Sequence, residues 1–224
     1  MPCNADRASL IRSSGDDLLS VDGAGPADCQ ALAEQLRSTG DWLECVAGID
    51  SVVVQFDTTT LDTETARHRI EEELRICRAA SDLVQAPLVE VPVLYGGEFG
   101  PDLDDVCEQV GLTPDELIEL HTGCEYRVDM LGFTPGFAYV GDLDDRLNVP
   151  RLSEPRVRVA AGSIGIADGR TGIYALAGPG GWQLIGRTAM ALFEPQSEEP
   201  FVLRAGMRVR FTAIDQQHFV AVTK

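Results

Sequence analysis

Residues 121–187 read HTGCEYRVDMLGFTPGFAYVGDLDDRLNVPRLSEPRVRVAAGSIGIADGRTGIYALAGPGGWQLIGR, and this stretch decides the fold of the larger part of the chain. From residue 124 onward the sequence shows only short strand-like segments between Gly- and Pro-rich turns, without helical periodicity. Eight of the 25 residues from Gly162 to Gly186 are glycine, against an average usage of roughly 7%. Many short strands with dense turns are typical of a β-barrel, which we therefore expect here.

The same region is positively charged within an acidic chain. From Arg146 to Arg187 there are six arginines and two acids, so this segment carries a net charge of +4 in a chain of net charge −18. Guanidinium groups among exposed backbone amides suit a bound anion. We therefore predict that the functional site lies in this segment.

The first 86 residues predict a separate α+β domain. The expected elements, in chain order, are two strands within 7–21, a helix from Pro26 to Gly40, strands over 42–47 and 51–56, and a helix after Asp62. The character of the sequence changes near residue 86. We therefore expect a small α+β domain over 1–86 and the barrel domain over 87–224.

Helices are also expected between the boundary and the barrel strands. Residues 88–95, LVEVPVLY, predict a strand, and Pro92 within it favours an edge or rim position. A short helix follows GGEFGPDLDD, and the capping box that begins at Thr113 opens another. That helix is expected to run to about Leu120, which places His121 at or just past its end.

Composition excludes several classes of protein. Asp and Glu number 36 against 18 Lys and Arg, which argues against nucleic-acid binding through a basic face. The only lysine is Lys224, so a P-loop, kinase or Schiff-base lysine is absent. Carboxylates in place of surface lysine keep a protein soluble in concentrated salt, and we hypothesise a halophilic source.

The six cysteines contain no C-x-x-C pair, so zinc spacing is missing and no metal site is expected. Buried reduced thiols in a cytoplasmic protein are the simplest interpretation. The segment MPCNADRASLIRSS lacks the apolar region of a secretion signal, and no run approaches the ~18 apolar residues of a membrane span.

Two histidines and one serine need a separate assessment. Ser163 lies in AGSIG, which resembles a nucleophile elbow but lacks its first glycine and its helix, so a turn hydroxyl or anion donor is favoured. His121 has two open interpretations, a helix-end cap or a general acid or base. His218 is expected to be structural or exposed in the terminal strand region.

At Gly132–Gly141 (GFTPGFAYVG) and Gly178–Arg187 (GPGGWQLIGR) the chain resembles a known family. It is similar to the B subunit of the ATP-dependent 5-oxoprolinase, a family also called allophanate hydrolase subunit 1 and KipI-type kinase inhibitors. Further matching blocks are VPVLYGGEFGPDLDDV, LIELHT and YRVDMLGF. Two departures, Ala160 in place of a proline and Ser14 in place of a leucine, concern turn stiffness rather than chemistry.

The resemblance implies a small α+β domain joined to a cyclophilin-like β-barrel. It implies a cytoplasmic enzyme component, inactive alone, that opens 5-oxo-L-proline to L-glutamate with ATP hydrolysis. The implied partners are the A subunit and the carboxyltransferase-like C subunit of 5-oxoprolinase, and a partner is one candidate for binding ATP with Mg²⁺. Two alternatives stay open: a non-catalytic inhibitor of histidine kinases, and subunit 1 of an allophanate hydrolase or urea-amidolyase-like carboxyltransferase.

Developing oxyanion and phosphoryl charge requires arginine and oriented amides. The candidate catalytic residues are His121, Gln183 and Arg187. The candidate substrate- or anion-binding residues are Arg127, Tyr139, Arg158, Gly162, Ser163, Gly180, Gly181 and Trp182. Among these, Gln183 would bond the ring amide, the glycines and Ser163 would offer backbone N–H groups, and Tyr139 and Trp182 would form the pocket walls.

Overall fold

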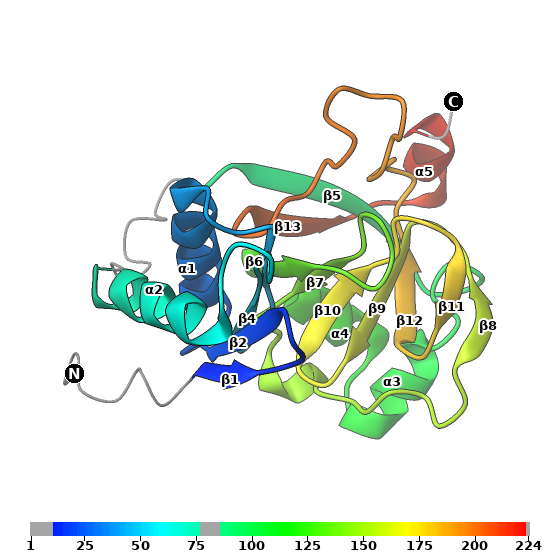
Figure 1. Ribbon diagram of the computed structural model, residues 1–224. Helices are drawn as coiled ribbons and strands as arrows, with labels where there is room; N and C mark the ends of the chain where they lie inside the picture. Colours follow the sequence, from blue (N-terminus) through cyan, green and yellow to red (C-terminus); the bar gives the residue numbers. More distant parts are fainter. Residues whose placement is uncertain (1–10, 77–85, 223–224) are drawn as a thin grey trace. The chain divides into compact units, whose positions relative to one another are not determined.

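The computed structural model describes residues 11–76 and 86–222, with side chains as far as Phe219 (Figure 1). The chain divides into two compact units, Met1–Gln85 and Ala86–Lys224. That these units are independently folding domains stays a prediction. Cys3, Cys77, Lys224 and the first residues of the expected N-terminal strand lie outside the described residues.

The first unit is an antiparallel sheet of order β1-β2-β4-β3 with two helices. Its elements are β1 (Ile11–Ser13), β2 (Leu18–Asp22), α1 (Pro26–Thr39), β3 (Glu44–Ala47), β4 (Ser51–Gln55) and α2 (Thr63–Ile76). Pro26 opens α1, and Gly40 ends it in the left-handed conformation (φ 73°), a backbone state that favours glycine. The helices and strands predicted for this unit are confirmed.

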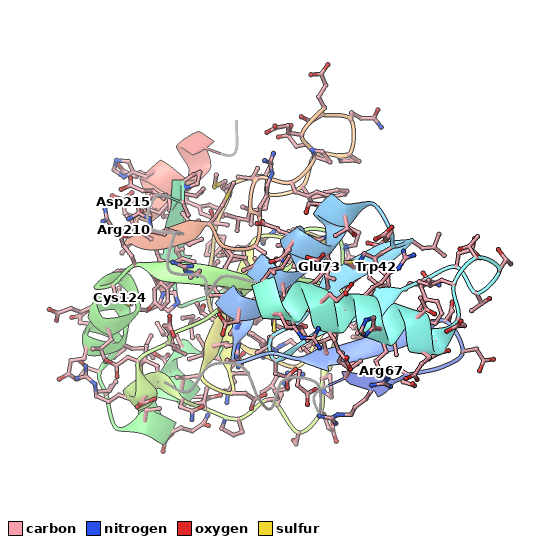
Figure 2. All side chains as sticks on the ribbon, turned by 60° about the vertical axis from the view of Figure 1, so that its left-hand side comes forward. Trp42, Arg67, Glu73, Cys124, Arg210 and Asp215 are labelled. Carbon is pink, nitrogen blue, oxygen red and sulfur yellow. The ribbon has the colours of Figure 1, made fainter. Side chains whose placement is uncertain are left out.

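Buried and partly exposed side chains alternate along the strands of this unit, and the buried ones form its core. Leu19 and Val21 of β2 and Val52 and Val54 of β4 are fully buried, while their neighbours are partly exposed. Polar contacts add to this apolar core. Arg67, labelled on α2 in Figure 2, donates a hydrogen bond to the carbonyl of Ile11, with a distance of 2.6 Å.

The second unit contains a closed barrel in the order β10-β7-β6-β13-β5-β12-β9. Its strands are β5 (Leu88–Tyr95), β6 (Tyr126–Leu131), β7 (Ala138–Val140), β9 (Ser163–Ala167), β10 (Arg170–Ile173), β12 (Gln183–Arg187) and β13 (Arg208–Ala213). Among the strands of residues 11–76 and 86–222, only β13 and β5 pair in parallel. A separate two-stranded sheet joins β8 (Arg156–Val159) and β11 (Gly178–Gly180). The predicted barrel is confirmed, whereas its likeness to cyclophilin stays a prediction.

Pro92 lies on β5, a barrel strand between β13 and β12 that pairs with each of them over only part of its length. β13 pairs along β5 from Leu88 to Val93, whereas the described pairing with β12 involves only Leu94 and Tyr95. Pro92 therefore lies where β5 has a strand on one side, which agrees with a rim position.

Three helices accompany the barrel, α3 (Leu103–Val110), α4 (Pro114–Thr122) and α5 (Gln216–Val222), together with the 3-10 turn η2 (Asp145–Leu147). The capping box at Thr113 is present, and α4 continues two residues beyond the expected end, so His121 lies in its last turn. The expectation of no helix after residue 124 is wrong. His218 lies on α5, where its backbone N–H bonds the Asp215 carboxylate at 2.9 Å, a local capping contact that strand-like periodicity cannot reveal.

Cys29, Cys45 and Cys107 are buried free thiols, whereas Cys124 is exposed, contrary to the expectation of burial. Its place in the turn between α4 and β6 explains the exposure. No helix within the described ranges is long and apolar enough to cross a membrane.

Candidate functional site

An aromatic hollow of about 260 Å³ opens beside the barrel strands. Five of its lining residues carry aromatic rings and one carries a charge. The hollow is lined by Phe133, Phe137, Tyr139, Arg151, Leu152, Pro155, Tyr174, Pro179, Gly180, Gly181 and Trp182. We call this set the aromatic hollow.

The rings of the hollow hold one another in edge-to-face contacts. The centroid of Phe137 lies 4.8 Å from Tyr139, 4.9 Å from Tyr174 and 5.7 Å from Trp182, with interplanar angles of 68–89°. Tyr139 and Trp182 are also 5.7 Å apart. Edge-to-face geometry between aromatic rings is favourable, so the walls are rigid rather than loosely packed.

Two glycines of the barrel allow these rings to approach the sheet. A Cβ at Gly172 on β10 would lie 2.7 Å from Cζ3 of Trp182 and 3.0 Å from Cζ of Phe137. A Cβ at Gly165 on β9 would lie 2.9 Å from Cβ of Trp182. Part of the glycine enrichment that predicts turns therefore serves close packing beneath the indole ring.

Arg151 is the one charged residue among those that line the hollow. Its guanidinium lies 5.9 Å from the centre of the Trp182 ring, a cation–π distance. Its Nε donates to a carboxylate oxygen of Asp168 at 2.8 Å, and the two side chains are 58% and 55% exposed. Because solvent screens such a pair, it contributes little to stability and can exchange with another carboxylate.

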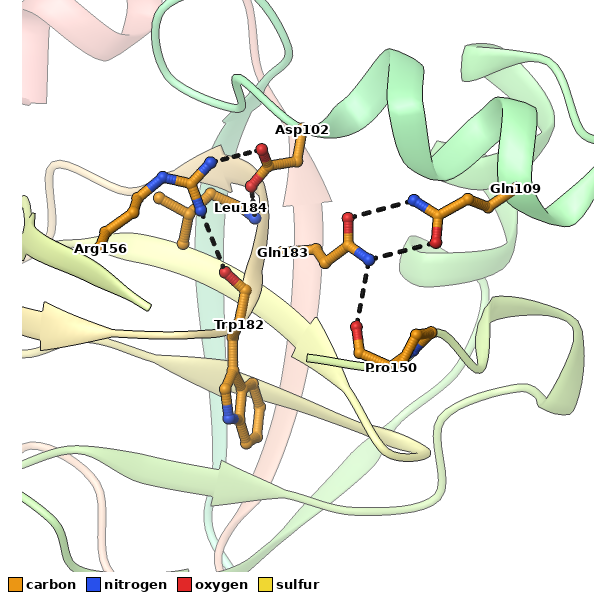
Figure 3. A network of polar contacts seen from close by, with 7 residues as sticks. All are labelled: Asp102, Gln109, Pro150, Arg156, Trp182, Gln183 and Leu184. Atoms are coloured by element: carbon orange, nitrogen blue, oxygen red, sulfur yellow. Dashed lines mark hydrogen bonds and ion pairs between the residues drawn. The ribbon is translucent and has the colours of Figure 1, made fainter. Parts of the chain in front are cut away.

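A polar network fixes the segment that leads into β12 and carries Trp182 (Figure 3). The buried carboxylate of Asp102 accepts a hydrogen bond from Arg156 at 2.5 Å and one from the backbone N–H of Leu184 at 2.6 Å. Arg156 also donates to the carbonyl of Trp182 at 3.5 Å. These contacts hold the start of α3, β8 and β12 together around the hollow.

The structure brings four of the predicted site residues together, Tyr139, Gly180, Gly181 and Trp182. Gln183 follows Trp182 directly but does not line the hollow. Its amide exchanges two hydrogen bonds of 3.3 Å with Gln109 and donates to the carbonyl of Pro150 at 3.1 Å (Figure 3). In this structure the amide of Gln183 is engaged within the fold, and its bond to a ring amide stays a prediction.

The predicted donors at Gly162, Ser163 and Arg187 form part of the barrel. The N–H of Gly162 bonds the carbonyl of Tyr174 at 2.7 Å, and Nε of Arg187 bonds the carbonyl of Ala161 at 2.9 Å. Ser163 is 3% exposed, and its N–H points to a backbone carbonyl 3.3 Å away. These three residues make contacts within the fold and none of them lines the hollow, and their role as anion donors stays a prediction.

The two remaining arginines lie apart from the hollow. Arg127 is on β6 opposite Arg208 of β13, and its charge acts on Asp129, whose pKa is raised by burial and held back by Arg170. Arg158 is exposed on β8. The predicted cluster of guanidinium groups is therefore not assembled, and Arg151, which belongs to the same arginine-rich stretch, was missed as the residue at the hollow.

His121 is buried in the barrel interior. Its Nδ1 lies 2.7 Å from the hydroxyl of Tyr95, and its Nε2 lies 3.0 Å from the hydroxyl of Thr171. Its ring packs against Phe211 with centroids 4.4 Å apart and an interplanar angle of 31°. Burial lowers the pKa of His121 from 6.5 to about 3, so the ring is neutral. With both nitrogens engaged and no exposed surface, His121 lies in the core and does not line the hollow, and its role as an acid or base stays a prediction.

The aromatic hollow does not fit a nucleoside triphosphate. Three phosphates with a metal ion require several cations and free backbone amides, whereas one guanidinium lines the hollow. Within the described residues there is also no group of three or more His, Cys, Asp or Glu side chains that could hold a metal ion.

Comparison with known proteins defines the class of this chain. Residues 10–203 match the family described as "Carboxyltransferase domain, subdomain C and D", and the chain belongs to this family. Within it, the chain is similar to the B subunit of the Bacillus subtilis 5-oxoprolinase, with 40% identity over 227 residues, 96% of this chain and 93% of that protein. The B subunit of the Escherichia coli O157:H7 5-oxoprolinase is 42% identical over 183 residues, 80% of this chain and 82% of that one.

Solved structures agree with the fold. An uncharacterized protein of Pyrococcus horikoshii is 35% identical with a TM-score of 0.59, over 94% of this chain and 100% of that one. The crystal structure of TTHA0988 matches with a TM-score of 0.76 at 34% identity over 89% of this chain, which spans only 40% of TTHA0988. Kluyveromyces lactis urea carboxylase has a TM-score of 0.77 at 18% identity, over 94% of this chain and 22% of that one, a likeness of fold alone.

Proposed function

We propose that this chain is the B subunit of an ATP-dependent 5-oxoprolinase, which opens 5-oxo-L-proline to L-glutamate together with the A and C subunits. The observation that carries the proposal is the 40% identity with the Bacillus subtilis B subunit over nearly the full length of both chains. An alignment of this extent includes both compact units of the chain.

The chemistry explains why such an enzyme needs several subunits. A lactam is stabilised by amide resonance, so its hydrolysis at neutral pH requires activation of the amide, which ATP hydrolysis supplies. The aromatic hollow lacks the cations that a triphosphate requires, which supports ATP binding on a partner protein. The role left to this chain is to bind and orient a small substrate and to exclude water from it.

The test is reconstitution from purified subunits. The chain alone, each pair, and the chain with the A and C subunits are incubated with 5-oxoproline and ATP, and glutamate is measured. We expect glutamate only from the full set and only with ATP. The assay is run in dilute and in molar salt, because the net charge of −18 motivates the halophilic hypothesis.

Two outcomes of the reconstitution contradict the proposal. The first is no glutamate from the full set in either salt, which is what the kinase-inhibitor alternative predicts. The second is turnover that avidin blocks, since a biotin-dependent step belongs to the carboxyltransferase alternative. A matched mixture without this chain is the control in each arm.

A further inference from the structure

Five aromatic side chains and a single positively charged one line the aromatic hollow. Its volume of about 260 Å³ lies below the roughly 300–1,000 Å³ of pockets that hold drug-sized ligands. No carboxylate is among the residues that line it. A ligand matched to this hollow is small, largely planar, and carries one negative charge.

Resting on the proposed function, we infer that the aromatic hollow is the binding site of the lactam substrate itself: the five-membered ring lies against Trp182 and Tyr139, and its carboxylate pairs with Arg151. A lactam presents a planar amide and methylene groups, which suit stacking between aromatic walls. Its carboxylate is the one charged group that the hollow has to neutralise.

Arg151 is suited to this exchange. Its bond to Asp168 uses Nε only, whereas a guanidinium presents five N–H donors in a fork that matches a carboxylate. Both members of the pair are more than half exposed, so replacing Asp168 by a ligand carboxylate costs little. The position of the guanidinium, 5.9 Å from the centre of the indole ring, places it beside any ligand stacked on Trp182.

The hollow also discriminates between substrate and product. Ring opening gives glutamate, which adds a second carboxylate and an ammonium group. No acidic residue lines the hollow to pair with the ammonium, and no second cation lines it to pair with the added carboxylate. Desolvating an unpaired charge is costly, so the product leaves more readily than the substrate binds.

Binding to the full-length chain alone tests the inference directly. Two tryptophans are present, and a Trp42→Phe variant leaves Trp182 as the one fluorescent indole. Within the described residues the indole N–H of Trp42 has no hydrogen-bond partner, so this change removes no such bond. We expect 5-oxoproline to change Trp182 fluorescence and to receive saturation transfer from the protein, with 2-pyrrolidone and glutamate each binding roughly 10-fold more weakly.

Arg151→Gln should weaken 5-oxoproline binding by roughly 10- to 100-fold. The matched control is Arg146→Gln, which removes an exposed guanidinium of similar exposure from an Asp144 pair outside the hollow and should leave binding unchanged. The inference is overturned by the absence of any binding up to about 10 mM, well above the usual range of KM. Equal affinity for 5-oxoproline and 2-pyrrolidone, or equal effects of the two variants, overturns it as well.

A second arm separates this inference from the proposed function. In the reconstituted complex, Arg151→Gln should raise KM for 5-oxoproline by roughly 10-fold or more, while Arg146→Gln should not. If the complex is active and Arg151→Gln leaves KM for 5-oxoproline unchanged, the assignment of the hollow is refuted, whereas the proposed function is not. Specific binding of 5-oxoproline to the chain with no glutamate from the complex refutes the proposed function and leaves the hollow assigned.

Discussion

His121 should make the barrel unit sensitive to mild acid. The folded unit holds this ring neutral, because burial lowers its pKa from 6.5 to about 3. Within the described part of the chain its neighbours are uncharged: the hydroxyls of Tyr95 and Thr171 and the rings of Tyr126 and Phe211. Between pH 6.5 and about 3, the His121 ring is protonated in the unfolded chain but neutral in the folded chain. Stability is therefore complete above pH 6.5 and is lost as the pH falls toward 3.

The magnitude follows from the displacement of the pKa. Each pH unit between the two pKa values is worth about 1.4 kcal/mol, so at pH 5 the loss from this one residue is about 2 kcal/mol. A domain has only about 5–15 kcal/mol of stability in total. His121 is fully buried, so solvent does not screen this effect.

The assay is urea unfolding at pH 7.5 and pH 5.0 for the wild type and for His121→Gln, which keeps an amide near Thr171 but cannot titrate. Carboxylates such as Asp129, whose own pKa is raised, act equally in both proteins and cancel in the difference. We expect the wild type to lose about 2 kcal/mol more than the variant. Equal losses, or a His121 ring resonance in wild-type NMR spectra that titrates near pH 6.5, would refute the reasoning.

Two further predictions concern the frame of the hollow. Gly100→Ala should cost several kcal/mol, because the new Cβ would lie 2.0 Å from the carbonyl oxygen of Ile185, whereas Gly178→Ala meets no atom within 4 Å and should melt like the wild type. Equal melting temperatures of the two variants would contradict this expectation. Asp102→Ala should cost about 3 kcal/mol by thermal melting, since it removes two charge-assisted bonds and leaves a buried N–H unpaired; a loss under about 1 kcal/mol would show the network to be dispensable.

Most of the secondary structure was predictable because its causes are local. Pro26 and Gly40 mark the ends of α1, and the capping box at Thr113 marks the start of α4. The failures have local causes as well. α5 carries no strong apolar period, and its start depends on the capping contact between Asp215 and His218. Such a contact is hard to distinguish from a turn in sequence.

Four of the predicted site residues line the hollow, and their roles stay predictions. Tyr139 lies on β7, whereas Gly180, Gly181 and Trp182 lie on β11 and in the segment before β12. The pairing of β7 with β10, β10 with β9 and β9 with β12 brings these segments of the sequence together. None of the predicted arginines lines the hollow, since nothing local in the sequence distinguishes Arg151 from Arg158. Their difference arises from the indole and the Asp168 carboxylate that the fold places beside one of them.

By itself, the sequence determined the barrel and the family, because turn residues, periodicity and long matching blocks are local features of the chain. Only the tertiary structure decided which polar side chains are engaged in the interior and which remain accessible to a ligand. Buried donors and acceptors must be paired, so the fold engaged Gln183 and His121 in its own interior. It left Arg151 in an exposed and exchangeable pair, and that difference in burial sets which cation a ligand can reach.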